Sequence, residues 1–174
     1  MNTETIKTLW ASGFVNRWHS HPDPRLRNAQ DTTAAHSQRV AILVMMLGPV
    51  ADTEERQSNV FHDLRAALLH DAPECFTGDV PAGAKRYQEV LEGDILPLAL
   101  ENLESVWWET TGLPDVFISP LVKLCDLLDA IMFVRHVAPD LLEREDWRTD
   151  ISKAYGQAAT LGFDLSVISG LIHG

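Results

Sequence analysis

The chain has 174 residues, of which 45% are hydrophobic, and this length is enough to bury one substantial core. The formal net charge of -11 excludes a protein that wraps long nucleic acid, because that binding mode needs a basic surface to displace counterions from phosphates. The longest apolar run, Val40 to Leu47, is far below the roughly 20 residues that a membrane-spanning helix needs. We therefore expect a single soluble domain over residues 1–174.

The first predicted helix carries its apolar residues on one stripe and ends near Trp18. That stripe comprises Ile6, Leu9, Trp10, Gly13 and Phe14. The following segment, residues 19–30, contains Pro22 and Pro24, which remove backbone donors and disfavour helix in the residues before them. This segment is predicted to be an ordered loop.

A second helix is predicted from Asp31, through His36, to about Leu47. The side chain of Asp31 can accept hydrogen bonds from the first amides of this helix, which makes it the expected N-cap. Gly48 and Pro49 then end the helix.

A third helix is predicted to open at Asp52, because Glu55 follows at the spacing of a capping box. Its helical pattern continues to Asp71. Further helices are expected over residues 85–111, with a kink at Pro97, and over residues 115–137 and 140–161. Strand-like alternation of useful length is missing from the sequence, so an all-α bundle is the predicted architecture.

The strongest local feature lies in residues 70–79, which begin with His70-Asp71, contain Glu74 and Asp79, and are followed by Lys85. Imidazole and carboxylate groups are ligands suited to divalent cations of borderline and hard character. Adjacent helix positions point about 100° apart, so His70 and Asp71 flank one ion only where it sits over the helix edge. The segment therefore predicts part of a metal site.

A complete metal site needs ligands from other helices, and His36 and Asp126 are the candidates because each lies within an otherwise apolar run. A buried carboxylate without a partner is unfavourable, so Asp126 on an apolar face calls for a cation. Alternatively, His36 is a hydrogen-bonded core histidine, and Asp126 accepts hydrogen bonds within or between helices.

Taken together, His36, the His70-Asp71 pair and Asp126 stand in the order and helical context of the HD-domain phosphohydrolases, which the chain resembles. This resemblance covers about residues 10–137 and implies a compact helical bundle of the HD-domain type. Separated motifs in the right order carry it, whereas a bare His-Asp pair would be weak support. The second such pair, at residues 62–63, lacks the Glu and Gly-Asp continuation and is interpreted as a surface pair.

The likeness is closest to the bacterial 5'-deoxynucleotidase branch, whose signature resembles residues 70–81 with Lys85 downstream. In that branch the first helix also ends in an Arg-Trp pair, as Arg17-Trp18 does here. The resemblance implies that Arg17 and Lys85 neutralise phosphate, the first as a fork and the second as a point charge. It also implies that Trp18 packs on the sugar or base and that Asp79 accepts from a sugar hydroxyl. An ordinary core role is the alternative for Trp18.

The resemblance implies a metal bound by His36, His70, Asp71 and Asp126. The expected cofactor is a divalent transition metal (Zn, Co or Mn), with Mg as an additional ion on the phosphates. Such an ion polarises a phosphoryl oxygen and lowers the pKa of bound water toward neutrality. Glu74, one turn beyond His70, is expected to orient or deprotonate that water, or to protonate the leaving oxygen. Its alternative role is that of a carboxylate on the helix surface.

The loop after the Arg-Trp pair, with His19 and His21, departs from the bacterial enzymes, so substrate choice is expected to differ. A compact chain with these motifs looks like the phage dATP triphosphohydrolases that accompany replacement of adenine by 2-aminoadenine in viral DNA. Arg25, Arg27 and Arg39 are either ligands for a longer phosphate tail or ordinary surface arginines.

Three hypotheses about function follow. The first is hydrolysis of dATP to deoxyadenosine and triphosphate, the second a 5'-deoxynucleotidase acting on dNMPs, and the third a noncatalytic nucleotide-binding regulator. The complete ligand set with Glu74 favours an enzyme. We expect a small-molecule deoxynucleotide as partner, no polymeric nucleic acid, no membrane, and a homo-oligomer (dimer or hexamer). Cys75 and Cys125, without a signal-peptide pattern, predict free thiols in the cytoplasm, or in the host cytoplasm if the chain is viral.

Overall fold

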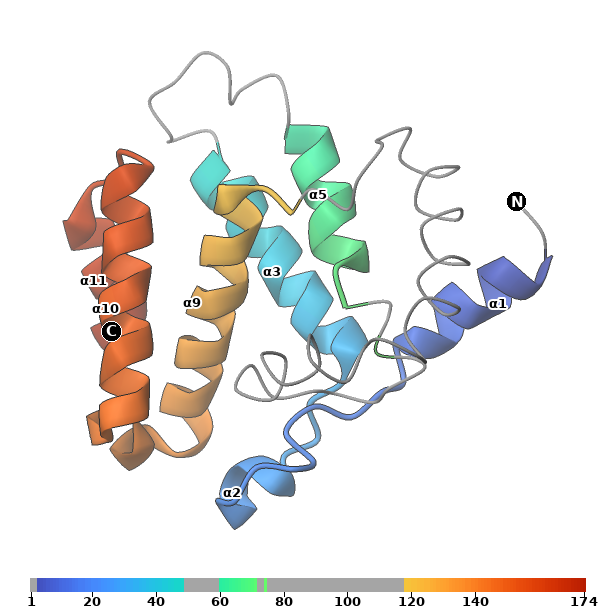
Figure 1. Ribbon diagram of the computed structural model, residues 1–174, viewed down its shortest axis with the longest axis horizontal. Coiled ribbons are helices and arrows are strands. Elements are labelled where there is room, and N and C mark those ends of the chain that lie inside the picture. Colours follow the sequence, from blue (N-terminus) through green and yellow to red (C-terminus); the bar gives the residue numbers. More distant parts are fainter. Residues whose placement is uncertain (1–2, 49–59, 72–73, 75–117) are drawn as a thin grey trace, which may run out of the picture. The chain divides into compact units, whose positions relative to one another are not determined.

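The computed structural model describes residues 3–48, 60–71, 74 and 118–174, which are helical apart from turns and one isolated bridge (Figure 1). The predicted all-α fold is therefore confirmed. The chain divides into two compact units, one within residues 1–37 and 69–117 and the other within residues 38–68 and 118–174. The expectation of a single domain over residues 1–174 stays a prediction.

In the first unit, helix α1 (Thr3–Ser12) is shorter than the sequence pattern predicts, because it ends at Ser12 and not near Trp18. The next three amides, at residues 13–15, bond to carbonyls only three residues back, which tightens the last turn. Asn16 then pairs with Thr32 in an isolated antiparallel bridge. This bridge draws the chain out of the helical path, although the apolar stripe continues to Phe14.

The segment predicted as an ordered loop contains a short helix, α2 (Pro24–Arg27). Pro24 suits the first helical position, where its missing amide loses no hydrogen bond. Asp23 is the N-cap, and its side chain accepts from the Arg25 amide at 2.9 Å.

Helix α3 (Thr33–Leu47) begins one residue later than a helix capped by Asp31 would. Thr32 is the N-cap, since its Oγ1 accepts from the Ala35 amide at 3.3 Å and its carbonyl accepts from the His36 amide at 3.0 Å. The prediction that Asp31 caps this helix is wrong, because the Asp31 side chain accepts from the indole of Trp18.

Helix α5 (Val60–Leu69) ends before the His-Asp pair, so the prediction that the helix continues to Asp71 is wrong. His70 and Asp71 form the turn that follows α5. The predicted capping box at Asp52 and Glu55 and the predicted helix over residues 85–111 lie outside the described residues.

The second unit contains α9 (Pro120–Val137), the 3-10 helix η2 (Pro139–Glu143), α10 (Glu145–Thr160) and α11 (Leu165–His173), which pack on one another (Figure 1). The helices predicted over residues 115–137 and 140–161 correspond to α9 and α10, while α11 was not predicted. Gly162, at φ 76°, marks the end of α10, and Asp164 caps α11 by accepting from the Ser166 amide at 2.8 Å. None of the described helices is long and apolar enough to cross a membrane. Among the fully buried aliphatic side chains of this unit are Val40, Val44, Val122, Leu124, Leu128, Ile131, Val134, Ile168 and Ile172.

Candidate metal and nucleotide site

His36 lies in the first turn of α3, where the Thr32 cap fixes the start of the helix. Its side chain is 0% exposed. A buried imidazole needs polar partners, and those of His36 come from the turn after α5.

His70 and Asp71 reach the site from that turn. The Asp71 carbonyl accepts from the Glu74 amide at 3.0 Å. Asp71 and Glu74 are both buried. The burial of Glu74 contradicts the alternative of a carboxylate on the helix surface, and its amide bond to Asp71 ties it to the His-Asp pair.

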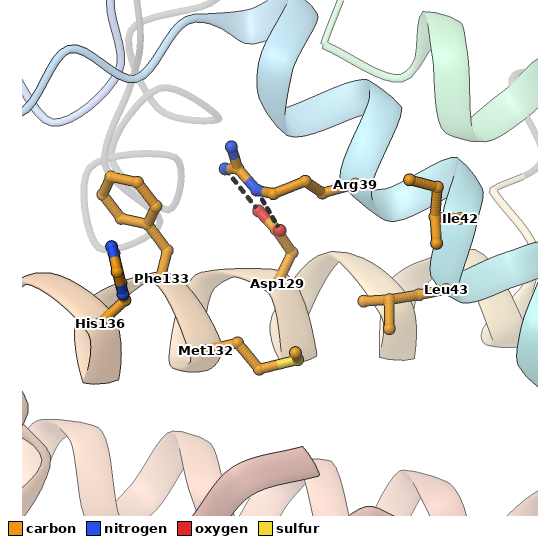
Figure 2. Close-up of a pocket in the computed structure, with 7 residues that line it drawn as sticks. All are labelled: Arg39, Ile42, Leu43, Asp129, Met132, Phe133 and His136. Carbon is orange, nitrogen blue, oxygen red and sulfur yellow. Dashed lines mark hydrogen bonds and ion pairs between the residues drawn. The ribbon is translucent and has the colours of Figure 1, made fainter. Parts of the chain in front are cut away.

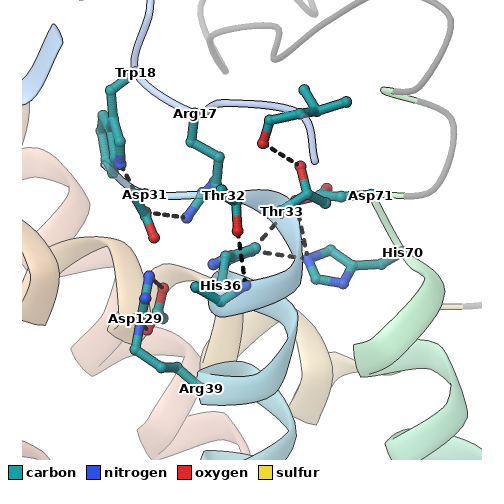
Figure 3. Close-up of polar contacts among 12 residues, drawn as sticks. Arg17, Trp18, Asp31, Thr32, Thr33, His36, Arg39, His70, Asp71 and Asp129 are labelled. Atoms are coloured by element: carbon teal, nitrogen blue, oxygen red, sulfur yellow. Dashed lines mark hydrogen bonds and ion pairs between the residues drawn. The ribbon is translucent and has the colours of Figure 1, made fainter. Parts of the chain in front are cut away.

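Three potential ligand atoms converge in the first unit (Figure 3). His36 Nε2 lies 3.1 Å from His70 Nε2 and 3.3 Å from Asp71 Oδ2. His70 Nε2 lies 3.5 Å from the same carboxylate oxygen. The sequence prediction that these three side chains share one site is therefore consistent with their geometry.

This arrangement fits a divalent cation. Two ligand atoms at about 2.1 Å from one ion are separated by about 3.0 to 3.4 Å in octahedral or tetrahedral geometry. The observed separations of 3.1, 3.3 and 3.5 Å are close to that range. Two imidazole nitrogens and a carboxylate oxygen are also a donor set that divalent transition metals accept.

Asp126, Asp79 and Lys85 were also predicted to belong to the site. Asp126 is half-buried on α9 in the second unit, and its part in the metal site stays a prediction. Asp79 and Lys85 lie outside the described residues, so their contacts with substrate stay predictions too.

Arg17 and Trp18 converge on Asp31, as Figure 3 shows. Trp18 Nε1 donates to Asp31 Oδ2 at 3.0 Å, and Arg17 Nη1 lies 3.5 Å from the same oxygen. The Arg17 guanidinium carbon is 5.3 Å from the centroid of the indole. Trp18 adopts φ 65°, in the left-handed region that side chains other than glycine rarely occupy. The pair is thus held in a specific conformation around Asp31, and its contact with substrate stays a prediction.

Asp129 was missed by the sequence analysis. It accepts from Arg39 Nε at 2.6 Å and from Arg39 Nη2 at 3.0 Å, and this fork forms one side of a pocket of about 410 Å³ between α3 and α9 (Figure 2). Asp129 could have been found from the sequence, because it follows Asp126 by three residues and so lies on the same face of an apolar helix. Apolar and aromatic side chains and one imidazole complete the lining: Ile42, Leu43, Met132, Phe133 and His136.

Two of the three arginines considered for a longer phosphate tail have carboxylate partners within the chain. Arg39 pairs with Asp129, and Arg25 Nη2 donates to Asp23 Oδ2 at 2.8 Å. Hydrogen bonds from Arg25 lower the pKa of Asp23 to about 2, so Asp23 is ionised at neutral pH. Arg25 and Arg39 would have to share their charge with these partners to bind a phosphate.

Cys125 is a free, fully buried thiol on α9, in agreement with the sequence prediction. Burial raises the pKa of this thiol well above its usual range, and the nearby Asp63 and Asp126 act in the same direction. Cys125 therefore serves as a small packing residue.

The second His-Asp pair, at residues 62–63, was predicted to lie on the surface. His62 is exposed, whereas Asp63 is half-buried, so the prediction holds for the histidine alone.

An all-α chain that gathers two histidines and an aspartate in this order has the features of an HD-domain phosphohydrolase. A family model described as 5'-deoxynucleotidase YfbR-like matches residues 7–104. A dATP triphosphohydrolase of Salmonella phage PMBT28 is 30% identical over 146 residues, which cover 77% of this chain and 68% of the phage protein. The chain therefore belongs to the YfbR-like 5'-deoxynucleotidase family, and it is a hydrolase that acts on deoxynucleotides. No solved structure matches the chain.

Proposed function

We propose that the protein hydrolyses dATP to deoxyadenosine and inorganic triphosphate with the help of a divalent cation. The observation that carries this proposal is the likeness to a phage dATP triphosphohydrolase over 77% of the chain. The buried cluster of His36, His70 and Asp71 supports it, because the cluster supplies the donor set that this chemistry needs.

The proposed reaction is a single displacement at the α-phosphorus. The oxygen of water forms a bond to that phosphorus, and the bond between phosphorus and the 5'-oxygen breaks. One proton of the water leaves the nucleophile, and the 5'-oxygen gains a proton, so the products are deoxyadenosine and triphosphate. Glu74 would accept the proton from water or deliver the proton to the leaving oxygen. Its burial next to the cluster suits a group that acts on a reacting atom.

His36, His70 and Asp71 would hold the cation, with Asp126 as the predicted fourth ligand. When bound, the cation supplies a Lewis acid that polarises a phosphoryl oxygen and lowers the pKa of water. The two carboxylates of Asp71 and Asp126 would balance the charge of a divalent cation, so the site would gain its positive charge for phosphate from Arg17 and Lys85.

Arg17 and Trp18 would recognise the nucleotide. The planar guanidinium of Arg17 can donate two parallel hydrogen bonds to a phosphate, and an indole face can stack on a purine. Lys85 and Asp79 are proposed to add a second positive charge for the phosphates and an acceptor for a sugar hydroxyl. Together these groups would read a deoxynucleotide at its phosphate, sugar and base.

Product analysis tests this proposal. The purified full chain is incubated with each dNTP and each dNMP in parallel with Mn²⁺, Co²⁺, Zn²⁺ and Mg²⁺, and products are separated by anion-exchange chromatography. Inorganic triphosphate and deoxyadenosine in equal amounts from dATP would support the proposal. Stepwise release of phosphate or pyrophosphate, or equal rates with all four dNTPs, would contradict it.

A second candidate is hydrolysis of deoxynucleoside monophosphates. The match of residues 7–104 to the 5'-deoxynucleotidase model favours this reaction. Both reactions can use the same metal site, and they differ in how the phosphate tail is held. Phosphate released from dAMP, without triphosphate from dATP, would identify this activity. Tight nucleotide binding without any product would instead indicate the noncatalytic regulator.

We also propose that the enzyme is a cytoplasmic homo-oligomer, a dimer or a hexamer. Exposed Ile42, Met45 and Met46 stand at helical spacing on α3 and form an apolar stripe. Light scattering coupled to size-exclusion chromatography gives the mass in solution, and a mass of 19.4 kDa would show a monomer and contradict the proposal.

A further inference from the structure

Asp31 contacts Arg17 and Trp18, two of the residues that are proposed to bind the nucleotide. Trp18 Nε1 donates to its Oδ2 at 3.0 Å, and Arg17 Nη1 lies 3.5 Å from the same atom. The Asp31 side chain is only 1% exposed. One buried carboxylate oxygen therefore accepts a hydrogen bond from the indole and forms an ion pair with the guanidinium.

The backbone around this carboxylate is fixed as well. The Arg17 amide donates to the Asp31 carbonyl at 2.9 Å, and the Thr33 amide donates to the Val15 carbonyl at 2.9 Å. These bonds lie on either side of the bridge between Asn16 and Thr32. Because α3 begins immediately afterwards, the Asp31 carboxylate is tied to the helix that carries the buried ligand at residue 36.

We infer that Asp31 is a positioning residue that holds Arg17 and Trp18 in the geometry for nucleotide binding. The inference rests on the proposed function, because that function gives Arg17 and Trp18 their contacts with substrate. Asp31 itself touches neither the phosphate nor the reacting atoms in this scheme. Its contribution is to fix the phosphate fork and the stacking ring before the nucleotide arrives, which lowers the entropy lost on binding.

A simpler role for Asp31 predicts the opposite result. If the carboxylate only balanced the charge of Arg17, then removing the negative charge would strengthen the attraction between Arg17 and a phosphate, and KM would fall. A positioning acceptor behaves differently, because its loss allows both side chains to move, and KM rises. The sign of the change in KM separates the two roles.

The test compares two substitutions that both remove the charge. Asp31→Asn keeps an oxygen that can accept from Trp18 and Arg17, whereas Asp31→Leu has no acceptor. We expect Asp31→Leu to raise KM for the preferred nucleotide by about 10- to 100-fold, the range for losing a hydrogen bond to a charged group. We expect Asp31→Asn to change KM less than about three-fold, and kcat and metal content to change little in both variants.

The matched control is the exposed ion pair of Arg144 and Asp146, in which Arg144 Nη2 lies 3.2 Å from Asp146 Oδ2. Asp146→Leu and Asp146→Asn also remove a carboxylate from an arginine, but we expect them to leave KM unchanged. If Asp31→Leu does not fold, Asp31→Ser replaces it, because the shorter serine side chain cannot reach the indole nitrogen.

Every outcome decides the inference. Equal KM values in the Asn and Leu variants, or a lower melting temperature with unchanged KM, would overturn it, since each result leaves Asp31 with a charge-balancing or structural role. A wild-type chain that binds nucleotide without hydrolysis would overturn the proposed function alone, and the same comparison is then made with Kd from calorimetry. A wild-type chain that binds no nucleotide would overturn both.

Discussion

The fork between Arg39 and Asp129 leads to a prediction about stability in which the two partners contribute unequally. The Arg39 side chain is 35% exposed, whereas the Asp129 side chain is 4% exposed. Arg39→Met leaves a buried carboxylate that has lost two charge-assisted hydrogen bonds, and we expect this to destabilise the fold by about 3 kcal/mol. Asp129→Leu leaves a guanidinium that water can reach, so the expected loss is about 1.5 kcal/mol, the lower end for a hydrogen bond to a charged group.

Thermal and urea unfolding, followed by circular dichroism, measure this asymmetry. In a chain of this size 1 kcal/mol corresponds to about 2 to 4 °C, so Arg39→Met should lower Tm by about 6 to 12 °C and Asp129→Leu by about 3 to 6 °C. The double variant, with two apolar side chains that can pack together, is expected to recover most of the loss.

Two results would refute this reasoning. A larger loss in Asp129→Leu than in Arg39→Met would mean that the buried carboxylate is not the costly partner. Additive losses in the double variant would mean that the two side chains do not act as a pair, despite their separation of 2.6 Å.

Three further predictions concern the metal, the chemistry and the buried thiol. His70→Ala should lose both bound divalent metal and hydrolysis, while His62→Ala, in the same region of the chain, keeps both; elemental analysis with full metal in the first variant would disprove the ligand assignment. Glu74→Gln should keep metal and nucleotide while kcat falls by about 10²- to 10⁴-fold, the usual loss when general acid-base catalysis is removed. A fall in nucleotide affinity with unchanged kcat would move Glu74 to the substrate contacts. In a Cys75→Ser background, Cys125 should react with a thiol reagent at neutral pH only in denaturant, because burial blocks access and raises the pKa of the thiol; fast labelling of the native chain would contradict this.

Local signals in the sequence predicted most of the described helices. Helices α3, α9 and α10 follow apolar patterns with a period near 3.6 residues. The short helix α2 was predicted to be loop, because Pro24 was interpreted as a helix breaker although it occupies the first helical position. The end of α1 was not predictable in this way, because a pairing between Asn16 and Thr32 ends it and such a pairing leaves no periodic signal. Helix α11 was missed although Asp164 provides an N-cap, since the segment before it is short and contains Gly162.

The candidate site was predictable to the extent that its residues form a motif in a fixed order. His36, His70 and Asp71 were expected to meet, and they do, within 3.5 Å of one another. Contacts that depend on tertiary packing were not predictable. The Asp129 side chain accepts hydrogen bonds from Arg39, 90 positions away, and the Asp31 side chain accepts from the indole of Trp18 and does not cap α3.

The left-handed backbone at Trp18 has a consequence for protein engineering. Along an extended strand, consecutive side chains point to opposite sides, so an Arg-Trp dipeptide in such a segment could not bring both groups to one carboxylate. The φ of 65° at Trp18 breaks this alternation, and Arg17 and Trp18 reach the same oxygen of Asp31. Transplanting the Arg-Trp dipeptide to another scaffold would therefore require this backbone torsion and the carboxylate acceptor as well. The two residues in an extended segment would place the guanidinium and the indole on opposite sides of the chain.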